Sequence, residues 1–211
     1  RSSIQPSFND SKDYFRVNVS GTIKVVNWAK KNKVKVVYAG SSSKHNNPSQ
    51  SPYAMYKYLG EEICKLYRSI YSLDIEIARF YNVYGHNQSL NELHGNVIGI
   101  WLSKVKKGSP LPIVGSGENR RDFINVIDLV DGLIKIAFSN QKNIDAWELG
   151  TGVNHSINEL FNMFNERFTC KSVYIPDQKG NPSLTLRKNN DMLSRLKWKP
   201  KDRLKDYIKN I

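Results

Sequence analysis

Residues 34–81 constrain the fold more than any other stretch, because they predict a strand, a helix and a second strand in succession. Residues 34–39 and 75–81 are short runs rich in β-branched and apolar residues, a pattern typical of buried strands. Between them, Ser51 can cap a helix and Pro52 suits its first position. Apolar residues then recur at helical spacing, at Leu59, Ile63, Leu66, Tyr67 and Ile70. Such a βαβ unit predicts an α/β fold with a parallel sheet.

Tyr53 and Lys57 are four residues apart on the predicted helix and therefore share one face. A free tyrosine has a pKa of about 10 and is a poor acid or base near neutral pH. A neighbouring ammonium group favours the phenolate, so we expect Lys57 to lower the pKa of Tyr53 and make it usable for proton transfer. The simpler alternative is that Tyr53 packs and Lys57 is a solvated charge, and the spacing alone leaves both open.

Three serines, at positions 41–43, follow the first predicted strand. Open α/β sheets bind their ligands just past the carboxyl ends of the strands, so these hydroxyls are candidates for a site. The alternative is a turn in which the serines bond their own backbone.

Five segments, taken in order, resemble the extended short-chain dehydrogenase/reductases, specifically the UDP-glucose 4-epimerase-like members of the NAD-dependent epimerase/dehydratase family. They are residues 18–22 (NVSGT), 41–43 (SSS), 53–57 (YAMYK), 79–85 (RFYNVYG) and 115–126 (GSGENRRDFINV). Any one of them alone is a weak signal, but together they span most of the chain. The resemblance implies a doubly wound parallel-sheet Rossmann domain with a smaller α/β substrate-binding domain.

The resemblance also implies roles for individual residues. It makes Ser41, Tyr53 and Lys57 catalytic, and it assigns NAD binding to these three together with Asn18 and Tyr81. It assigns binding of a nucleotide sugar to Ser42, Asn82, Asn96, Val97 and Arg121. Simpler alternatives are an exposed polar helix position for Asn18, a turn residue for Asn82 and a surface charge for Arg121.

The reaction implied by the resemblance is 4-epimerisation of a UDP-hexose through a transient keto-sugar, with NAD as cofactor. Related dehydratases and decarboxylases place carboxylates right after the catalytic hydroxyl, whereas this chain has Ser42 and Ser43 there. This favours an epimerase or a reductase. Two alternatives stay open, namely another nucleotide-sugar oxidoreductase such as a dehydratase, and an inactive structural or interaction module.

The chain lacks the strand, GxxGxxG loop and helix with which the resembled family begins. We therefore expect an N-terminally truncated fragment that binds NAD poorly and is itself inactive. Residues 1–88 are expected to be the C-terminal part of the Rossmann domain. Residues 89–211 are expected to be mainly the substrate-binding domain, with residues 122–150 returning to the Rossmann domain.

Other elements follow from local patterns. Residues 1–11 are expected to form a loop, and helices are expected over residues 13–31, from Asp128 and over residues 157–168. Residues 111–123 are expected to form two strands joined by a hairpin turn at Gly115 and Gly117. Relatives often carry a second diphosphate-binding arginine where this chain has Gln178. Arg187 and Lys179 are candidates to substitute for it, and the sequence leaves open which residue does so.

Composition limits the other classes of function. The net charge is +13, but Lys and Arg are scattered and no nucleic-acid-binding motif accompanies them, so we expect no nucleic-acid role. The chain has two cysteines and four histidines without metal-ligand spacing, which predicts a reducing cytoplasmic setting and no metal site. No apolar run reaches the roughly 20 residues that cross a bilayer. The family resemblance implies a homodimer formed through the helices that carry Asn18 and Tyr53.

Overall fold

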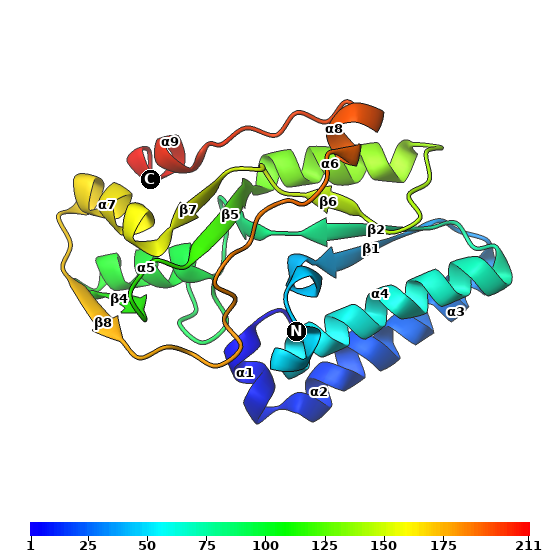
Figure 1. Cartoon of the computed structure of the whole chain (residues 1–211), viewed down its shortest axis with the longest axis horizontal. Coiled ribbons are helices and arrows are strands. Elements are labelled where there is room, and N and C mark those ends of the chain that lie inside the picture. Colours follow the sequence, from blue (N-terminus) through cyan, green and yellow to red (C-terminus); the bar gives the residue numbers. More distant parts are fainter.

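The computed structural model, which describes all 211 residues, places a parallel sheet between two layers of helices (Figure 1). Its strands have the order β1-β2-β6, with Gly40 opposite Arg79 and Ser41 opposite Phe80. Helices α3 and α4 cover one face and α6 covers the other (Figure 1). This arrangement confirms the predicted α/β class. The bounds are β1 Val36–Ser41, β2 Ile75–Phe80, β6 Trp147–Leu149, α3 Gly21–Asn32, α4 Pro52–Tyr71 and α6 Val126–Phe138.

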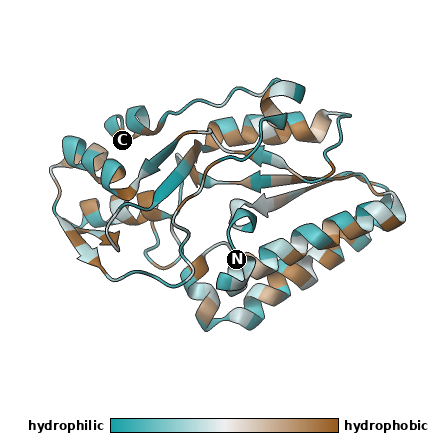
Figure 2. Cartoon of the chain, viewed as in Figure 1, coloured by the Kyte–Doolittle hydropathy of each residue, from teal (hydrophilic) through white to brown (hydrophobic).

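Helix α4 begins as predicted. The Ser51 hydroxyl accepts the Ala54 N–H at 3.1 Å, and Pro52 occupies the first turn. At Gly60 the helix lies so close to β1 that a Cβ atom there would be 2.0 Å from the Tyr38 hydroxyl oxygen. The helix is therefore fixed against the strand that leads into the predicted site. Both α3 and α4 carry apolar and polar residues in alternation, as helices with one packed face do (Figure 2).

The predicted helix over residues 13–31 is confirmed, with an interruption that the sequence did not indicate. Helix α2 (Ser11–Phe15) runs into a π-helical turn, η1 (Arg16–Ser20), before α3 begins. The prediction of a loop over residues 1–11 is wrong, because α1 (Ile4–Asn9) forms there. Ser7 ties α1 to α4, since its hydroxyl donates to the Ile4 carbonyl and accepts the Tyr53 N–H. A tertiary contact thus stabilises a helix too short to form alone.

The other five strands form two further small sheets, β3-β5-β7 and β4-β8. Strand β5 pairs with β3 in parallel and with β7 in antiparallel fashion, while β4 pairs with β8 in parallel. The predicted hairpin over residues 111–123 is therefore wrong. Gly115 and Gly117 do make a turn, with φ of 62° and 78°, but β4 and β5 diverge into different sheets. The bounds are β3 Asn82–Tyr84, β4 Leu111–Val114, β5 Arg120–Asn125, β7 Asn154–Ser156 and β8 Ser172–Ile175.

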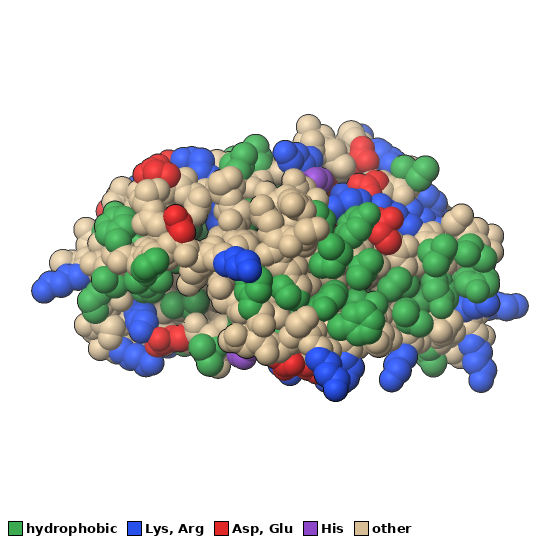
Figure 3. Space-filling view, turned by 60° about the horizontal axis from the view of Figure 1, so that its bottom comes forward, with side chains coloured by type: hydrophobic (Ala, Val, Ile, Leu, Met, Phe, Trp, Pro, Cys, Tyr) green, Lys and Arg blue, Asp and Glu red, His purple; other side chains and the backbone are tan.

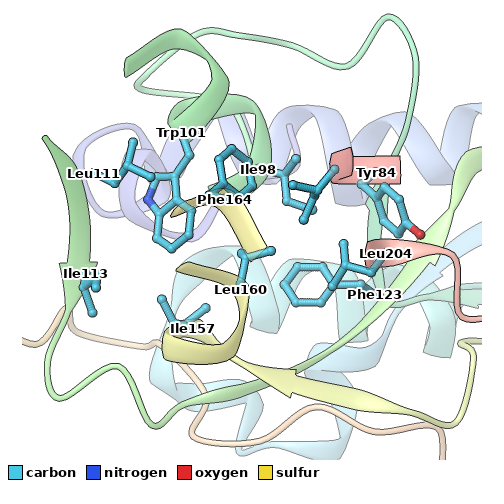
Figure 4. Close-up of a cluster of buried hydrophobic side chains, with 11 residues drawn as sticks. Tyr84, Ile98, Trp101, Leu111, Ile113, Phe123, Ile157, Leu160, Phe164 and Leu204 are labelled. Atoms are coloured by element: carbon cyan, nitrogen blue, oxygen red, sulfur yellow. The ribbon is translucent and has the colours of Figure 1, made fainter. Parts of the chain in front are cut away.

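Helices α5, α7 and α9 pack with β3, β4 and β5 around a hydrophobic core (Figure 4). Trp101 meets Phe164 edge to face at 5.3 Å between ring centroids, and Leu160 and Phe123 are buried beside them. Helix α7 has the bounds predicted for it, and a capping box between Ser156 and Glu159 explains its start. Helix α6 begins at Val126, two residues before Asp128, because Asn125 caps it. The remaining helices are α5 Val97–Lys106, α7 Ile157–Phe168, α8 Asp191–Arg195 and α9 Leu204–Lys209.

None of the helices combines the length and the apolar character needed to cross a membrane.

Candidate active site

A cavity of about 1330 Å³ lies at the carboxyl end of β1 and is also lined by residues of α4, α5, β4 and β5. Of the residues predicted to form the site, only Asn18 does not line it. The cavity brings together side chains from five separate segments, which are Ser41, Ser42, Tyr53, Lys57, Tyr81, Asn82, Asn96, Val97 and Arg121.

Ser41 is the last residue of β1, and the short helix η2 (Ser42–His45) follows it. The Ser41 hydroxyl oxygen accepts the Ser43 N–H at 3.2 Å and lies 2.9 Å from the Ser43 hydroxyl. The Tyr53 hydroxyl donates to the same oxygen at 3.4 Å. The serines thus form the local turn and also present Ser41 to Tyr53.

Tyr53 is surrounded by protein on several sides. Its ring meets that of Tyr14 edge to face, with centroids 6.5 Å apart. Burial raises the pKa of Tyr53 above its ordinary value, and the hydrogen bond with Ser41 offsets this only in part. The expectation that Lys57 lowers the pKa of Tyr53 is therefore wrong for this structure.

The reason is where Lys57 points. Its ammonium donates to the Ala39 carbonyl oxygen and lies 4.7 Å from the centroid of the Tyr38 ring. Burial lowers the pKa of Lys57 to about 8, although the Glu61 carboxylate acts in the opposite direction. Lys57 is thus tied to β1 two residues before Ser41, and it lines the same cavity as Tyr53.

Asn18 lies in the π-helical turn η1, where its side-chain amide donates to the Arg1 carbonyl at 3.1 Å. Tyr81 and Asn82 lie where β2 passes into β3. The Tyr81 hydroxyl donates to Glu148 Oε2 at 3.0 Å, and Asn82 Nδ2 donates to the Asp122 carbonyl at 3.1 Å. These two hydrogen bonds fix the backbone at the junction of β2 and β3, and this backbone lines the cavity.

The residues predicted to bind the nucleotide sugar come from three elements. Asn96 caps α5 by accepting the Gly99 N–H at 2.8 Å and donates to the Val83 carbonyl, which places Val97 at the start of the helix. The side chain of Arg121, on β5, makes one hydrogen bond, from Nη1 to the Arg120 carbonyl at 3.0 Å, and no ion pair. Burial lowers the pKa of Arg121 to about 10. A guanidinium with so few internal partners is suited to bind an anion in the cavity.

Gln178 and Asn181 line the cavity in the segment where relatives often carry a second arginine. The ammonium of Lys179 lies 5.4 Å from the centroid of the Phe8 ring, and Arg187 Nη2 donates to the Thr151 carbonyl at 3.3 Å. Neither residue lines the cavity, and Arg187 Nε and Nη1 are buried without a hydrogen-bond partner.

Sequence reasoning missed a buried group of charges behind Ser41. Arg79 donates to Glu61 and to Asp145, and its Nη1 lies 3.5 Å from Glu148. Glu61 Oε1 in turn accepts the Ser41 N–H at 3.1 Å. One signal was available, because Glu61 follows Tyr53 by eight residues and Lys57 by four, which puts all three on one helix face.

Comparison with known proteins places this geometry in a family. Residues 1–150 match the profile of the NAD dependent epimerase/dehydratase family. The chain belongs to this family. A putative UDP-glucose 4-epimerase from Methanocaldococcus jannaschii is 32% identical, over 92% of this chain and 68% of that protein. UDP-glucuronic acid decarboxylase 1 from Danio rerio is 24% identical, and its alignment covers 79% of this chain and 44% of that protein.

Solved structures show the same fold. A UDP-N-acetylglucosamine 4-epimerase from Methanobrevibacter ruminantium, in complex with UDP-N-acetylmuramic acid, superimposes with a TM-score of 0.88 at 25% identity. That match covers 98% of this chain and 71% of the other. The comparisons thus confirm the resemblance, and they leave the specific reaction among several that this NAD-dependent family carries out.

The residues present fit one end of NAD. The Ser41 and Tyr53 hydroxyls and the Lys57 ammonium line one cavity, and together they offer donors and acceptors suited to a ribose and a nicotinamide. These three residues come from β1 and α4, two elements that Gly60 and Tyr38 hold in close contact.

Proposed function

We propose that the protein is an NAD-dependent nucleotide-sugar epimerase that inverts C4 of a UDP-hexose. The observation that supports this most is the shared cavity, in which Ser41, Tyr53 and Lys57 lie with the weakly partnered Arg121. The first three residues suit proton transfer at a sugar hydroxyl, and Arg121 suits a diphosphate.

In the proposed reaction, Tyr53 removes the proton of the 4-hydroxyl while C4 loses a hydride, and the sugar becomes a 4-keto sugar. NAD, when bound, supplies the acceptor and later the donor of that hydride. The keto-sugar then rotates in the site so that its other face receives the hydride. Tyr53 returns the proton, and the other epimer leaves. Ser41 orients the reacting oxygen. Lys57, with a pKa of about 8, is still protonated at neutral pH and adds positive charge to this wall of the cavity.

We assign the rest of the cavity to the substrate and cofactor. Arg121 binds the diphosphate, while Ser42, Asn82, Asn96 and Val97 contact the sugar and the nucleoside. Tyr81 contributes backbone next to the nicotinamide, and Asn18 supports the site from behind α4. Residues 1–88 then form part of the NAD-binding domain and residues 89–211 mainly the substrate-binding domain, with residues 122–150 belonging to the first.

Two alternatives are kept for specific reasons. The similarity to a UDP-glucuronic acid decarboxylase supports another nucleotide-sugar oxidoreductase, although Ser42 and Ser43 stand where elimination needs a carboxylate. The raised pKa of Tyr53 supports a module without turnover, since a phenol that resists ionisation is a poor base.

We further propose a cytoplasmic homodimer. Large apolar side chains gather on the face formed by α3 and α4 (Figure 3), with exposed fractions of 61% for Trp28 and 60% for Ile70. Val25 and Leu66 are more than half exposed beside them. An apolar face of this kind suits a second copy of the same chain. Trp28→Glu is expected to shift the dimer to monomer in sedimentation experiments.

The epimerase proposal is tested on the full-length protein with NAD present, by measuring interconversion of UDP-glucose and UDP-galactose. Tyr53→Phe is expected to lower kcat by roughly 10²- to 10⁴-fold, because it removes the acid and base. Tyr56→Phe is the matched control, since Tyr56 lies three residues away on α4 and bonds Ser11 at 2.8 Å. Bound NAD without any conversion would redirect the assay to other nucleotide sugars, and absence of both would favour the module without turnover.

A further inference from the structure

Glu61 is buried at the centre of contacts that link helix α4 to the end of β1. Its side chain is 1% exposed. Oε1 accepts the backbone N–H of Ser41 at 3.1 Å, and Oε2 accepts from Arg79 Nη2 at 2.8 Å. One carboxylate therefore joins the proposed catalytic serine to a fixed charge on β2.

The rest of the charge group holds this carboxylate in place. Arg79 Nη1 and Nη2 donate to Asp145 at 2.6 Å and 2.8 Å, so Arg79 is fixed from two sides. Lys44 and Lys65 donate to Asp145 as well, at 2.9 Å and 2.7 Å. A carboxylate bound in this way by a planar guanidinium has little freedom to turn away from Ser41.

Gly40 shows how close the helix comes to the strand. A Cβ atom at Gly40 would be 2.5 Å from Glu61 Oε1 and 3.0 Å from Ile77. On either side of Gly40, a hydrogen bond joins the helix to the strand. Lys57 donates to the Ala39 carbonyl, and Glu61 accepts the Ser41 N–H. Lys57 and Glu61, one and two helical turns after Tyr53, thus attach helix α4 to the end of β1.

We propose that Glu61 is a positioning residue, which sets the Ser41 hydroxyl relative to Tyr53 through the Ser41 backbone. This inference rests on the proposed function for its catalytic consequence. The Tyr53–Ser41 hydrogen bond is already long, at 3.4 Å, so a small movement of Ser41 breaks it. Misplacement of reacting groups by about 1 Å can cost about 100-fold in rate.

The test compares Glu61→Asp with Glu61→Gln. Aspartate keeps the charge but is one methylene shorter, so it cannot hold both Arg79 and the Ser41 N–H. Glutamine keeps the length. Its one carbonyl oxygen can still accept the Ser41 N–H, but its amide nitrogen then faces the Arg79 guanidinium, which lowers stability. Glu62→Asp is the matched control, since the neighbouring Glu62 is half exposed and pairs with Lys65 at 3.1 Å.

Two measurements are made on each full-length variant, namely hydrogen exchange of the Ser41 amide and the steady-state constants with UDP-glucose. Glu61→Asp is expected to speed exchange at Ser41 and to lower kcat by about tenfold or more, with little change in KM. Glu61→Gln is expected to keep most of kcat even where it unfolds more easily, and Glu62→Asp is expected to change neither measurement.

If the Ser41 amide exchanges at the same rate in Glu61→Asp as in the wild type, the proposal is overturned. So would equal losses of kcat in both Glu61 variants that follow their loss of stability. If the wild-type protein shows no conversion of UDP-glucose, the proposed function fails separately, and the exchange measurement alone decides whether Glu61 positions Ser41.

Discussion

Arg79 and Arg121 are two arginines at the same site with opposite surroundings. Arg79 is fully buried behind Ser41 and meets three carboxylates, Glu61, Asp145 and Glu148. Burial alone lowers the pKa of Arg79, but the bonds with Asp145 and Glu61 raise it above its ordinary value. Arg121 lines the cavity and meets no carboxylate, so burial lowers its pKa to about 10.

The difference in partners indicates a structural role for Arg79 and a binding role for Arg121. A buried charge is expensive unless partners compensate it, and Arg79 has its partners within the chain. Arg121 lacks them, so on the proposed function we expect the diphosphate of the substrate to offset the cost of burying this charge. The protein itself thus fixes the part of the site around Ser41. For the part around Arg121 we expect the missing partner to be a ligand.

Arg79→Met tests the first half of this comparison and has the largest expected effect. It leaves Glu61 and Glu148 buried without their guanidinium, which is expected to lower the free energy of unfolding by about 3–5 kcal/mol. Urea denaturation of the full-length protein measures it. Arg68→Met is a control from the same region, since Arg68 donates only to backbone carbonyls such as that of Asn143. A loss below about 1 kcal/mol for Arg79→Met would contradict its structural role.

Lys57 resembles Arg121 more than Arg79, because it has a carbonyl partner but no carboxylate within ion-pair distance. Its pKa is about 8 in the folded chain against 10.5 ordinarily. Between these values the unfolded chain binds one more proton, so stability rises with pH. The stability of the wild type relative to Lys57→Met is expected to rise by about 3 kcal/mol from pH 8 to pH 10.5.

The measurement is denaturation of both proteins across this pH range. The comparison with Lys57→Met cancels the titration of the tyrosines and the other lysines, which both proteins share. A flat difference would mean that Lys57 keeps its proton up to its ordinary pKa. The effect of burial on Lys57 would then be absent, or the Glu61 carboxylate would offset it in full.

Arg121→Met tests the second half of the comparison. Loss of a charged hydrogen-bonding partner of the diphosphate is expected to weaken UDP binding by roughly 10- to 100-fold, or about 1.5–3 kcal/mol. The free energy of unfolding is expected to stay the same or to rise, since a poorly compensated buried charge is removed. Calorimetric titration with UDP and with uridine separates the two ligands, because uridine has no phosphate.

Arg120→Met is the matched control for Arg121→Met. Arg120 is the neighbour on β5, but it donates to Glu159 at 3.0 Å and does not line the cavity. Equal weakening of UDP binding in both variants would show a general loss of positive charge and would contradict a specific role for Arg121.

Local sequence signals predicted most of the elements around the site. Ser51 and Pro52 mark the start of α4, because capping depends on residues within one turn. The grouping of Ser41, Tyr53 and Arg121 around one cavity came from the family resemblance, since spacing along the chain cannot specify it.

The failures share a physical cause. Gly115 and Gly117 have the local chemistry of a hairpin turn, but β4 pairs with β8, which lies some 60 residues away in the chain. The pKa of Tyr53 depends on burial and on where Lys57 points, neither of which a four-residue spacing contains. The sequence does not indicate the contacts of Glu61, because its partners, Arg79 and the Ser41 N–H, come from other elements.

Gln178→Arg sharpens the comparison by giving the binding part of the site a second arginine. Gln178 lines the cavity, so an arginine there can reach a phosphate, and we expect UDP to bind about fivefold more tightly, or about 1 kcal/mol. Uridine binding should not change, and the gain should shrink as salt is added. Lys179→Arg is the control, because Lys179 lies over Phe8 and outside the cavity lining. An equal gain from both variants would mean that net charge attracts UDP and that position 178 does not contact its phosphates.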